Sequence, residues 1–334
     1  MDKITKNQLA AMLLITDAFT LFCCKGHISI ITAIGFLCGI VIQFIMSVPL
    51  IQLCKNGVSV ENSGKAVQSI YLIYLLLWGG MLFSMLWKAS DVIYIPYENS
   101  NGIWGKLLIA GLIALVCLYS SSTGIKAVSR SAVIAAAAGI ISLLIVTVSA
   151  VCSSDWGNLL RTEDAGGFLD EISRGFVLSG GLGSFAVLLG FTKGNALKNS
   201  LYYFTGKIIL TAVVTVSSIL VAGGIMKITE FPVVTAAQLS QPFSVQRIDS
   251  LFLIIFAVFA VFSIAVQSLA AADILMKIFP KFRHLRTTAV LVLMIGSAFL
   301  FSGENSYNIL YAVAVAFVLL VVPSAVLLKR SVTK

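Results

Sequence analysis

Apolar residues gather into ten long runs along this chain, and this pattern restricts the fold more than any other feature. An α-helix needs about 20 predominantly apolar residues to cross a bilayer. Only 11% of the 334 residues are charged, against roughly 25% in a soluble domain. The sequence therefore predicts an all-α polytopic membrane protein with ten transmembrane helices. The runs are approximately 8–24, 29–53, 67–88, 104–121, 132–152, 175–191, 201–226, 249–276, 287–302 and 307–328.

The connections between these runs are short, so we expect a single transmembrane domain over residues 1–334. Its first half would cover about 1–152 and its second half about 175–334. Between them, residues 153–174 form the longest exposed stretch, in which apolar side chains such as Trp156 alternate with acidic ones. Such a stretch is typical of a short helix lying on the membrane surface, although a plain loop would fit nearly as well.

The basic residues indicate how the chain is oriented. If the N-terminus is cytoplasmic, the inner segments hold fifteen of the 23 lysines and arginines and the outer segments hold seven. Cytoplasmic loops of membrane proteins carry an excess of basic residues. We therefore expect a multi-pass protein with both termini in the cytoplasm. The formal net charge of +9 then reflects these loops, and no nucleic-acid partner is expected.

Glycine and serine interrupt the sixth run. Each glycine in a helix interior costs about 0.8–1 kcal/mol relative to alanine. A helix in a bilayer breaks only where the freed backbone groups face protein or water, so such a segment predicts a midplane binding site of a transporter-like fold. A packing face, where small residues let two helices approach, explains the pattern equally well. The candidate ligand-binding residues are Ser179, Gly180, Gly181, Gly183 and Ser184.

The position of this segment among the ten runs predicts the architecture. With ten spans, the first and the sixth open two five-helix halves, and an odd number of spans per half inverts one half relative to the other. Both opening runs are among the shortest. Corresponding short or broken segments in two inverted halves are typical of a LeuT-like transporter core. We therefore expect a LeuT-like fold with a 5+5 inverted repeat.

Asp17 is the acidic residue that lies deepest in an apolar run. Asp17 and Gly183 are each ten residues from the inner ends of their runs, or about 15 Å, near the centre of a core about 30 Å thick. A carboxylate there costs about 2.5–3.5 kcal/mol or more and marks a functional site by default. Asp17 would bind an amine, take up a proton or help coordinate a cation. Alternatively it is a structural acid, capped by Thr16 or Thr20 or held neutral.

Lys207 and Asp273 are two further charges inside predicted spans. They lie about 10 Å and about 6 Å from the inner ends of those spans. A lysine stem can snorkel that far, or the two residues would pair near the inner face. We expect structural roles for both, with ion coupling as the alternative, because an ammonium group can take the place of a sodium ion in such cores.

The sequence contains no catalytic constellation, so no enzymatic activity is expected. There is no Ser/His/Asp set, no HExxH motif, no pair of intramembrane aspartates at plausible spacing and no Walker-type loop. The six cysteines and two histidines lack the spacing of metal ligands, so neither a metal nor another cofactor is expected. The cysteines are interpreted as inert membrane residues.

Several stretches together resemble the B subunit of spore germinant receptors, the GerAB-type family of the amino acid–polyamine–organocation superfamily. Residues 4–9 (ITKNQL) are similar to the start of that family before its first helix. Residues 124–130 (GIKAVSR) resemble its cytoplasmic segment before the fifth helix. Phe231-Pro232, followed by residues 246–252 (QRIDSLF), resembles its outer loop and the start of its eighth helix.

The resemblance implies a ten-helix LeuT-like protein in the spore inner membrane or a bacterial cell membrane. Such proteins work beside a receptor A subunit and a lipoprotein C subunit, and they sense small nutrients, commonly amino acids. The first helix departs from the family pattern, in which it usually carries a Gly-containing break. Here residues 16–22 read TDAFTLF, so Phe19 and Phe22 would crowd a pocket and Asp17 would charge it.

The leading hypothesis from the sequence is therefore a receptor subunit that senses a nutrient, an amino acid or similar, to trigger spore germination. Its ligand would bind between the first and sixth spans, with contributions from the third and eighth. The alternative is a proton- or sodium-coupled secondary transporter of amino acids or amines, and a third possibility is a receptor scaffold that binds no ligand. Candidate wall residues in the third span are Tyr71, Tyr74, Trp78 and Ser84.

Overall fold

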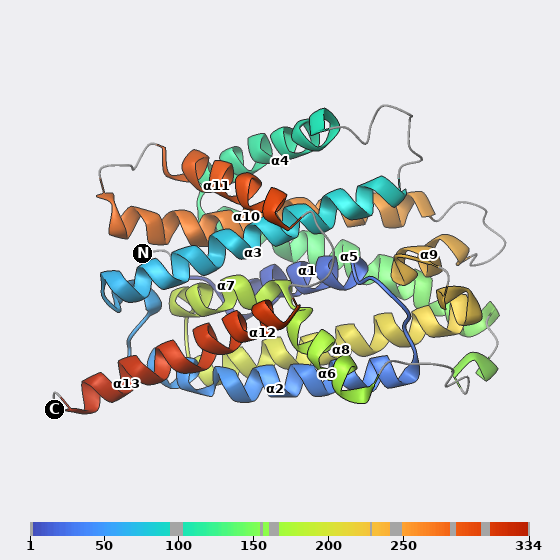
Figure 1. Ribbon diagram of the computed structural model, residues 1–334, viewed down its shortest axis with the longest axis horizontal. Helices are drawn as coiled ribbons and strands as arrows, with labels where there is room; N and C mark the ends of the chain where they lie inside the picture. Colours follow the sequence, from blue (N-terminus) through green and yellow to red (C-terminus); the bar gives the residue numbers. More distant parts are fainter. Residues whose placement is uncertain are drawn as a thin grey trace.

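The computed structural model of the chain describes residues 3–93, 103–153, 156–159, 167–227, 229–240, 249–280, 285–301 and 308–332. These residues are mostly helical, and the long helices run roughly along the horizontal axis of Figure 1. Among them, seven helices are long and apolar enough to cross a bilayer, or eight if one bent pair counts as a single span. The seven are α2 (Ile30–Lys55), α3 (Lys65–Ile93), α4 (Ile103–Thr123), α5 (Ile125–Ser153), α8 (Ala196–Ala222), α10 (Asp249–Ile278) and a continuous stretch of α12 (Asn308–Ala316), a π-helical turn (Phe317–Val321) and α13 (Val322–Val332).

Two shorter apolar helices, α1 (Lys6–Phe22) and α11 (Arg286–Leu300), belong to the same bundle. α1 lies in the middle, packed against α5, α7, α8 and α10. A capping box fixes its start: Thr5 Oγ1 accepts from the Gln8 N–H, and Gln8 Oε1 accepts from the Thr5 N–H at 2.9 Å. Because α1 and α11 are short, ten membrane-spanning helices and the inverted repeat stay predictions.

The sixth predicted span is a bent pair of helices, α6 (Phe168–Val177) and α7 (Gly180–Leu188). The two meet at 47°, and Leu178 and Ser179 between them are not helical. A break is therefore present, but it lies at Leu178–Ser179, and the residues from Gly180 to Ser184, where the interruption was expected, form the start of α7. The boundary predicted at residue 175 is also wrong. α6 begins earlier, within the stretch interpreted as a surface helix or a loop.

The burial of α6 explains this difference. α6 packs along α2, where a Cβ atom added at Gly39 would lie 2.6 Å from the Phe176 nitrogen, so only a glycine allows the two backbones to come so close. In α6, Arg174 Nη1 donates to both carboxylate oxygens of Glu171 at 2.8 Å. Because the two charges pair, this turn of α6 can pack inside the bundle. A prediction based on apolar runs excludes such a charged turn.

The short connecting elements gather at the two ends of the bundle. They are η1 (Val60–Asn62), η2 (Trp156–Leu159), η3 (Leu189–Phe191), η4 (Gly223–Lys227) and α9 (Pro232–Leu239). At one end the Ile4 N–H donates to the Phe191 oxygen at 3.0 Å, and the Lys193 N–H donates to the Ile4 oxygen at 2.9 Å. The chain termini lie toward this same end in Figure 1. At the other end, Lys25 forms an ion pair with Glu230.

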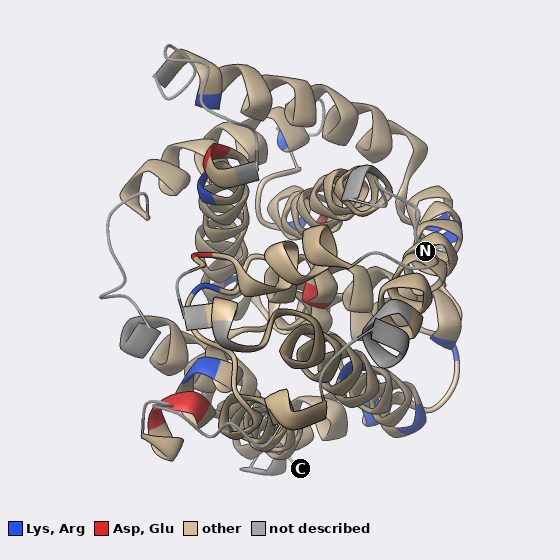
Figure 2. Cartoon of the chain, turned by 90° about the vertical axis from the view of Figure 1, so that its right-hand side faces the viewer, with Lys and Arg blue, Asp and Glu red and all other residues tan. Residues whose placement is uncertain are grey.

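The outer surface of the bundle is apolar. Leu108 on α4, Ile134 on α5 and Leu300 on α11 are 64%, 74% and 66% exposed, and charged residues are few in the end-on view of Figure 2. In water such a surface would drive aggregation, whereas lipid tails solvate it. The exposed faces therefore agree with an integral, multi-pass membrane protein.

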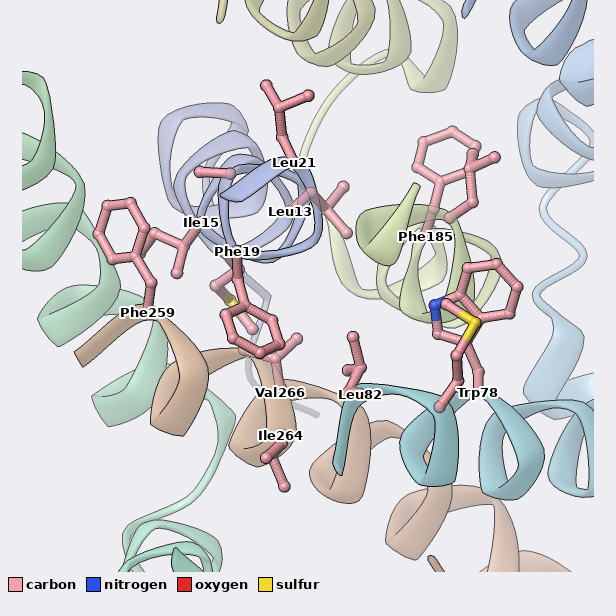
Figure 3. Close-up of a cluster of buried hydrophobic side chains, with 14 of the residues drawn as sticks. Leu13, Ile15, Phe19, Leu21, Trp78, Leu82, Phe185, Phe259, Ile264 and Val266 are labelled. Carbon is pink, nitrogen blue, oxygen red and sulfur yellow. The ribbon is translucent and has the colours of Figure 1, made fainter. Parts of the chain in front are cut away.

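The core lies where α1, α3, α7 and α10 meet. Figure 3 shows side chains of these four helices filling the space between them, among them Phe19, Trp78 and Phe185. Phe19 packs against Phe256 of α10 with ring centroids 5.5 Å apart. The predicted ligand region between the first and sixth spans thus lies beside a closely packed core.

Candidate functional site at the break between α6 and α7

The first turn of α7 presents backbone N–H groups that have no partner within the helix, and side chains of α1 bind two of them. The Gly180 N–H donates to Thr20 Oγ1 at 3.1 Å, and the Gly181 N–H donates to Asp17 Oδ1 at 3.0 Å. The Gly180 oxygen accepts from Trp78 Nε1 at 3.1 Å. Thr20 and Asp17 of α1 thereby satisfy N–H groups that the break leaves free, as an apolar environment requires, and the Trp78 bond joins α3 to the same turn. Asp17 also places its negative charge at the positive end of α7.

Asp17 collects donors from three elements. Besides the Gly181 N–H, its carboxylate accepts from Ser179 Oγ at 3.0 Å and from Tyr203 Oη of α8 at 2.7 Å. Lys207 Nζ, also of α8, lies 3.4 Å from Asp17 Oδ1. The side chains of Asp17 and Lys207 are only 4% and 2% exposed. Such a set of donors stabilises an ionised carboxylate, so the site is a buried ion pair.

Oxygen atoms surround the Lys207 ammonium group. It donates to Gln43 Oε1 of α2 at 2.7 Å and to Ser179 Oγ, in addition to its pairing with Asp17. The Gln43 amide in turn donates to the Phe176 oxygen in the last turn of α6 at 2.7 Å. The ion pair therefore connects α1, α2 and α8 to both sides of the break.

Neither structural explanation considered from the sequence for Lys207 is correct. Its side chain does not snorkel, because it is buried, and it pairs with Asp17 instead of Asp273. Asp273 lies 3.6 Å from Arg286 of α11. The depth of Lys207 along its span could be estimated from the sequence, but the direction in which its side chain points could not.

The site is closed to any solute in this conformation. The space bordered by Asp17 and Lys207 is about 10 Å³, enough for about one water molecule. A Cβ atom added at Gly181 would lie 2.6 Å from Tyr203 Oη and 2.8 Å from Asp17 Oδ2. One at Gly183 would overlap the Trp78 ring. The helix break and the glycine packing face, alternatives in the sequence, thus occur side by side.

The other predicted residues surround this centre. Thr16 Oγ1 bonds to the Met12 oxygen at 3.0 Å within α1, and the Thr16 backbone packs against Gly180. Tyr74 packs on Trp78 with ring centroids 5.5 Å apart. Tyr71 and Ser84 bond to backbone oxygens of α12–α13 and of the end of α11, so they join helices outside the centre.

Phe19 and Phe22 were expected to crowd the pocket, and this expectation is wrong. Both rings lie on the face of α1 that packs on α10, where Phe22 contacts Phe252 with centroids 5.0 Å apart. Asp17 lies on the opposite side of the helix, toward α7 and α8.

Three buried polar atoms near the core have no hydrogen-bond partner among the described residues. They are Tyr74 Oη on α3, Ser184 Oγ on α7 and Gln267 Oε1 on α10. Buried polar groups are usually satisfied, so each of these needs an explanation. The Gln267 amide and the Trp78 ring both lie against Gly183, which places this part of α10 beside the predicted ligand segment.

Sequence reasoning missed three of these residues: Gln43, Tyr203 and Gln267. Gln43 and Gln267 are amides inside apolar runs, and a polar side chain at membrane depth is expensive unless it is bonded. The two amides could therefore have been identified from the sequence. Tyr203 gave no comparable signal, because a tyrosine near the end of an apolar run is common at membrane interfaces.

Comparison with known proteins supports the transporter-like fold. A solved structure of Mhp1, a nucleobase-cation-symport-1 family transporter, in a closed conformation with bromovinylhydantoin bound, is similar with a TM-score of 0.60 at 15% sequence identity. The similarity covers 94% of this chain and 75% of that chain. The inward-facing conformation of Mhp1 is similar with a TM-score of 0.61 at 15% identity, over 95% and 76%. No family model and no curated protein matches the sequence.

These similarities confirm the predicted LeuT-like transporter fold, while the long apolar helices agree with a membrane location. They concern the fold alone, because the sequence identity is low. The assignment to the germinant-receptor family stays a prediction.

Proposed function

We propose that the protein is a secondary transporter of amino acids or amines in a bacterial cell membrane, and that it is coupled to protons. The observation that carries the proposal is the buried Asp17–Lys207 pair at the break between α6 and α7. Broken helices in a transporter fold are where solutes and coupling ions bind, and intramembrane charges that pair with each other mark ion pathways.

The surroundings of Lys207 favour protons over sodium. Its ammonium group already lies among oxygens of Asp17, Gln43 and Ser179, the ligand type that a sodium ion would need. A proton delivered to Asp17 would neutralise one member of the pair. Lys207 would then lack its counter-charge in an apolar environment, which is unfavourable. We infer that this imbalance separates α1 and α8 from the break and opens the site.

A polar solute would then bind the groups that the closed state leaves without partners. Tyr74, Ser184 and Gln267 contribute such atoms from α3, α7 and α10. The two five-helix halves would be α1–α5 and α6–α13, with α6 and α7 as one broken span and both termini in the cytoplasm.

Uptake into proteoliposomes tests this proposal. We expect labelled amino acids or amines to accumulate under an inward proton gradient. A sodium gradient should leave their uptake unchanged. Asp17→Asn preserves the shape of the carboxylate but not its charge, so it should abolish concentrative uptake. Accumulation that requires sodium would refute the proton coupling, and a lack of uptake for all solutes would refute transport.

A second candidate is the B subunit of a spore germinant receptor, acting beside an A subunit and a lipoprotein C subunit. The resemblance of residues 4–9, 124–130 and 246–252 to that family favours it. Saturable binding of an amino acid without uptake, together with copurification of the two partner subunits, would support the receptor. A protein that assembles with those subunits but binds no amino acid, amine or nucleoside would be a scaffold.

A further inference from the structure

A second cavity, of about 410 Å³, lies at the end of the bundle where the Lys25–Glu230 ion pair is found. Its wall comes from the chain just after α1, from the last turns of α3, from α6 and from the end of α11. Cavities that bind small molecules are usually about 300–1,000 Å³. This cavity is therefore large enough for a small solute, unlike the space beside Asp17.

The charged side chains among the described lining residues are all basic: Lys25, Lys88 and Arg174. Arg174 is held in place by several bonds. Its Nη1 binds Glu171, and its Nη2 donates to the Lys25 oxygen at 2.7 Å. The wall thus presents a fixed guanidinium group, the cation best suited to bind a carboxylate.

The rest of the wall is largely apolar. Met81 and Met85 of α3 line it together with Phe36 and Phe301. Methionine side chains adapt to irregular apolar ligands. A basic side combined with an apolar side matches a ligand that carries an anionic group on a hydrophobic body.

Only one layer of side chains separates this cavity from the buried ion pair. Phe36 and Leu178 line both the cavity and the small space beside Asp17 and Lys207. The Arg174 guanidinium group lies over the Phe36 ring, 5.6 Å from its centroid. A ligand bound against Arg174 would therefore contact the layer of side chains that closes the inner space.

We propose that this cavity is the first binding site of the solute and that it selects small carboxylates with an apolar body. The carboxylate would bind on the side of Arg174 and Lys88, and the body would contact Met81 and Met85. The inference rests on the proposed transport function and narrows its substrate class from amino acids or amines to apolar amino acids, which would enter by their carboxylate.

Calorimetric titration of the purified protein in detergent tests the selectivity. The probes are 4-methylpentanoate and 3-methylbutan-1-amine, which share one apolar body and carry opposite charges. We expect the acid to bind and the amine not to bind. Equal affinity for the two probes, or no binding of the acid, would overturn the proposal.

Three variants locate the binding. Met85→Trp should abolish binding of the acid, because the bulkier indole would occupy the part of the cavity where the apolar body of the ligand is proposed to lie. The double variant Glu171→Gln/Arg174→Gln removes the guanidinium group without leaving Glu171 unpaired, and it should weaken binding at least about tenfold, or about 1.4 kcal/mol. Lys106→Gln is the matched control, since Lys106 pairs with Asp91 at 3.8 Å and does not line the cavity. It should bind the acid like the wild type.

The outcomes separate this inference from the proposed function. Acid binding that Met85→Trp abolishes, without any uptake, supports the cavity and refutes transport. Amino-acid uptake that Met85→Trp leaves unchanged supports transport and refutes the cavity as a binding site. A melting curve for each variant identifies loss of binding that is due to misfolding, and Met85→Ala then replaces a misfolded Met85→Trp. It enlarges the cavity, so unchanged affinity for the acid would count against the site.

Discussion

Asp17 and Lys207 bind each other in a region with almost no solvent, so each is stable only while the other is charged. Removing one partner of a buried ion pair typically costs about 3–5 kcal/mol, whereas replacing both by apolar or neutral groups of similar size is often nearly neutral. We therefore expect Lys207→Met to lower the melting temperature strongly and the double variant Asp17→Asn/Lys207→Met to recover much of the loss. Equal melting of the single and double variants would argue against the pair.

Among the described residues, Tyr203 donates a hydrogen bond to Asp17 at 2.7 Å, shorter than those from Ser179 and Gly181. Hydrogen bonds to charged groups contribute about 1.5–3 kcal/mol, so Tyr203→Phe should destabilise the protein by roughly that amount without changing the packing of the ring on Phe185. Tyr202 offers a matched control, because it is adjacent in sequence and 48% exposed. Tyr202→Phe should leave the melting temperature unchanged, and a similar drop for both variants would contradict the assigned role.

The sequence predicted Asp17 and the glycine segment of this site but not the lysine that pairs with Asp17. The depth of Asp17 in its run indicated a functional site, and the glycines of the sixth run indicated what lies opposite. The partner of Asp17 was not found, because distance along a span says nothing about the rotation of a helix. The packing of α8 against α1 and α2 determines which partner Lys207 faces.

At the scale of elements, a break in the sixth span was predictable because glycine and serine disfavour a continuous helix. Its place was not, since the glycines themselves are helical in α7 and the break precedes them. The start of α6 was not predictable from hydropathy. In the sequence, Glu171 and Arg174 lie just before residue 175, where the apolar run was predicted to begin. In the structure they neutralise each other, and their helix packs against α2 and the chain after α1. Hydropathy therefore does not detect α6, the first half of the broken span, because it counts the two charges and not their pairing.

The approach of α7 to α1 depends on Gly181. A Cβ atom there would lie 2.6 Å from Tyr203 Oη and 2.9 Å from the Leu13 oxygen, and the latter belongs to backbone that cannot move aside cheaply. We expect Gly181→Ala to reduce the amount of folded protein, measured by size-exclusion chromatography of a fluorescent fusion. Such a loss would show that the glycine packing face, one of the two explanations considered from the sequence, is needed for folding.

Gly296 in α11 provides the control for this substitution. No atom lies within 4 Å of a Cβ placed there, and alanine is favoured over glycine in a helix interior by about 1 kcal/mol. Gly296→Ala should therefore be neutral or slightly stabilising. A folded yield for Gly181→Ala equal to that of Gly296→Ala would show that α1 and α7 can separate without cost.

For the molecule as a whole, hydropathy located the helices well. The described helices begin and end within several residues of the predicted runs over most of the chain, since the length of an apolar run follows the thickness of the bilayer. Hydropathy does not encode which helix packs against which. The central position of α1 and the contact of α2 with α6 come from close backbone approach at glycines such as Gly35 and Gly39.

The connecting segments separate into two groups, as the predicted topology requires. Ile4 bonds to Phe191 and Lys193 at one end, and Gly190 packs against Ser59 there. At the other end, Lys25 contacts both Arg174 and Glu230. Three segments predicted to be inner thus meet at one end, and three predicted to be outer meet at the other.

Which end faces the cytoplasm follows from charge and can be measured. The end that contains Ile4 carries most of the basic residues, so we expect it to be cytoplasmic. Asn56 and Asp170 are exposed positions at the two ends, and each is suited to a single cysteine in a cysteine-free background. On intact cells, an impermeant thiol reagent should label Asp170→Cys, while Asn56→Cys should react only after the membrane is permeabilised. Labelling of Asn56→Cys from outside, with Asp170→Cys protected, would invert the molecule and place the 410 Å³ cavity on the cytoplasmic side, where it would release solute instead of receiving it.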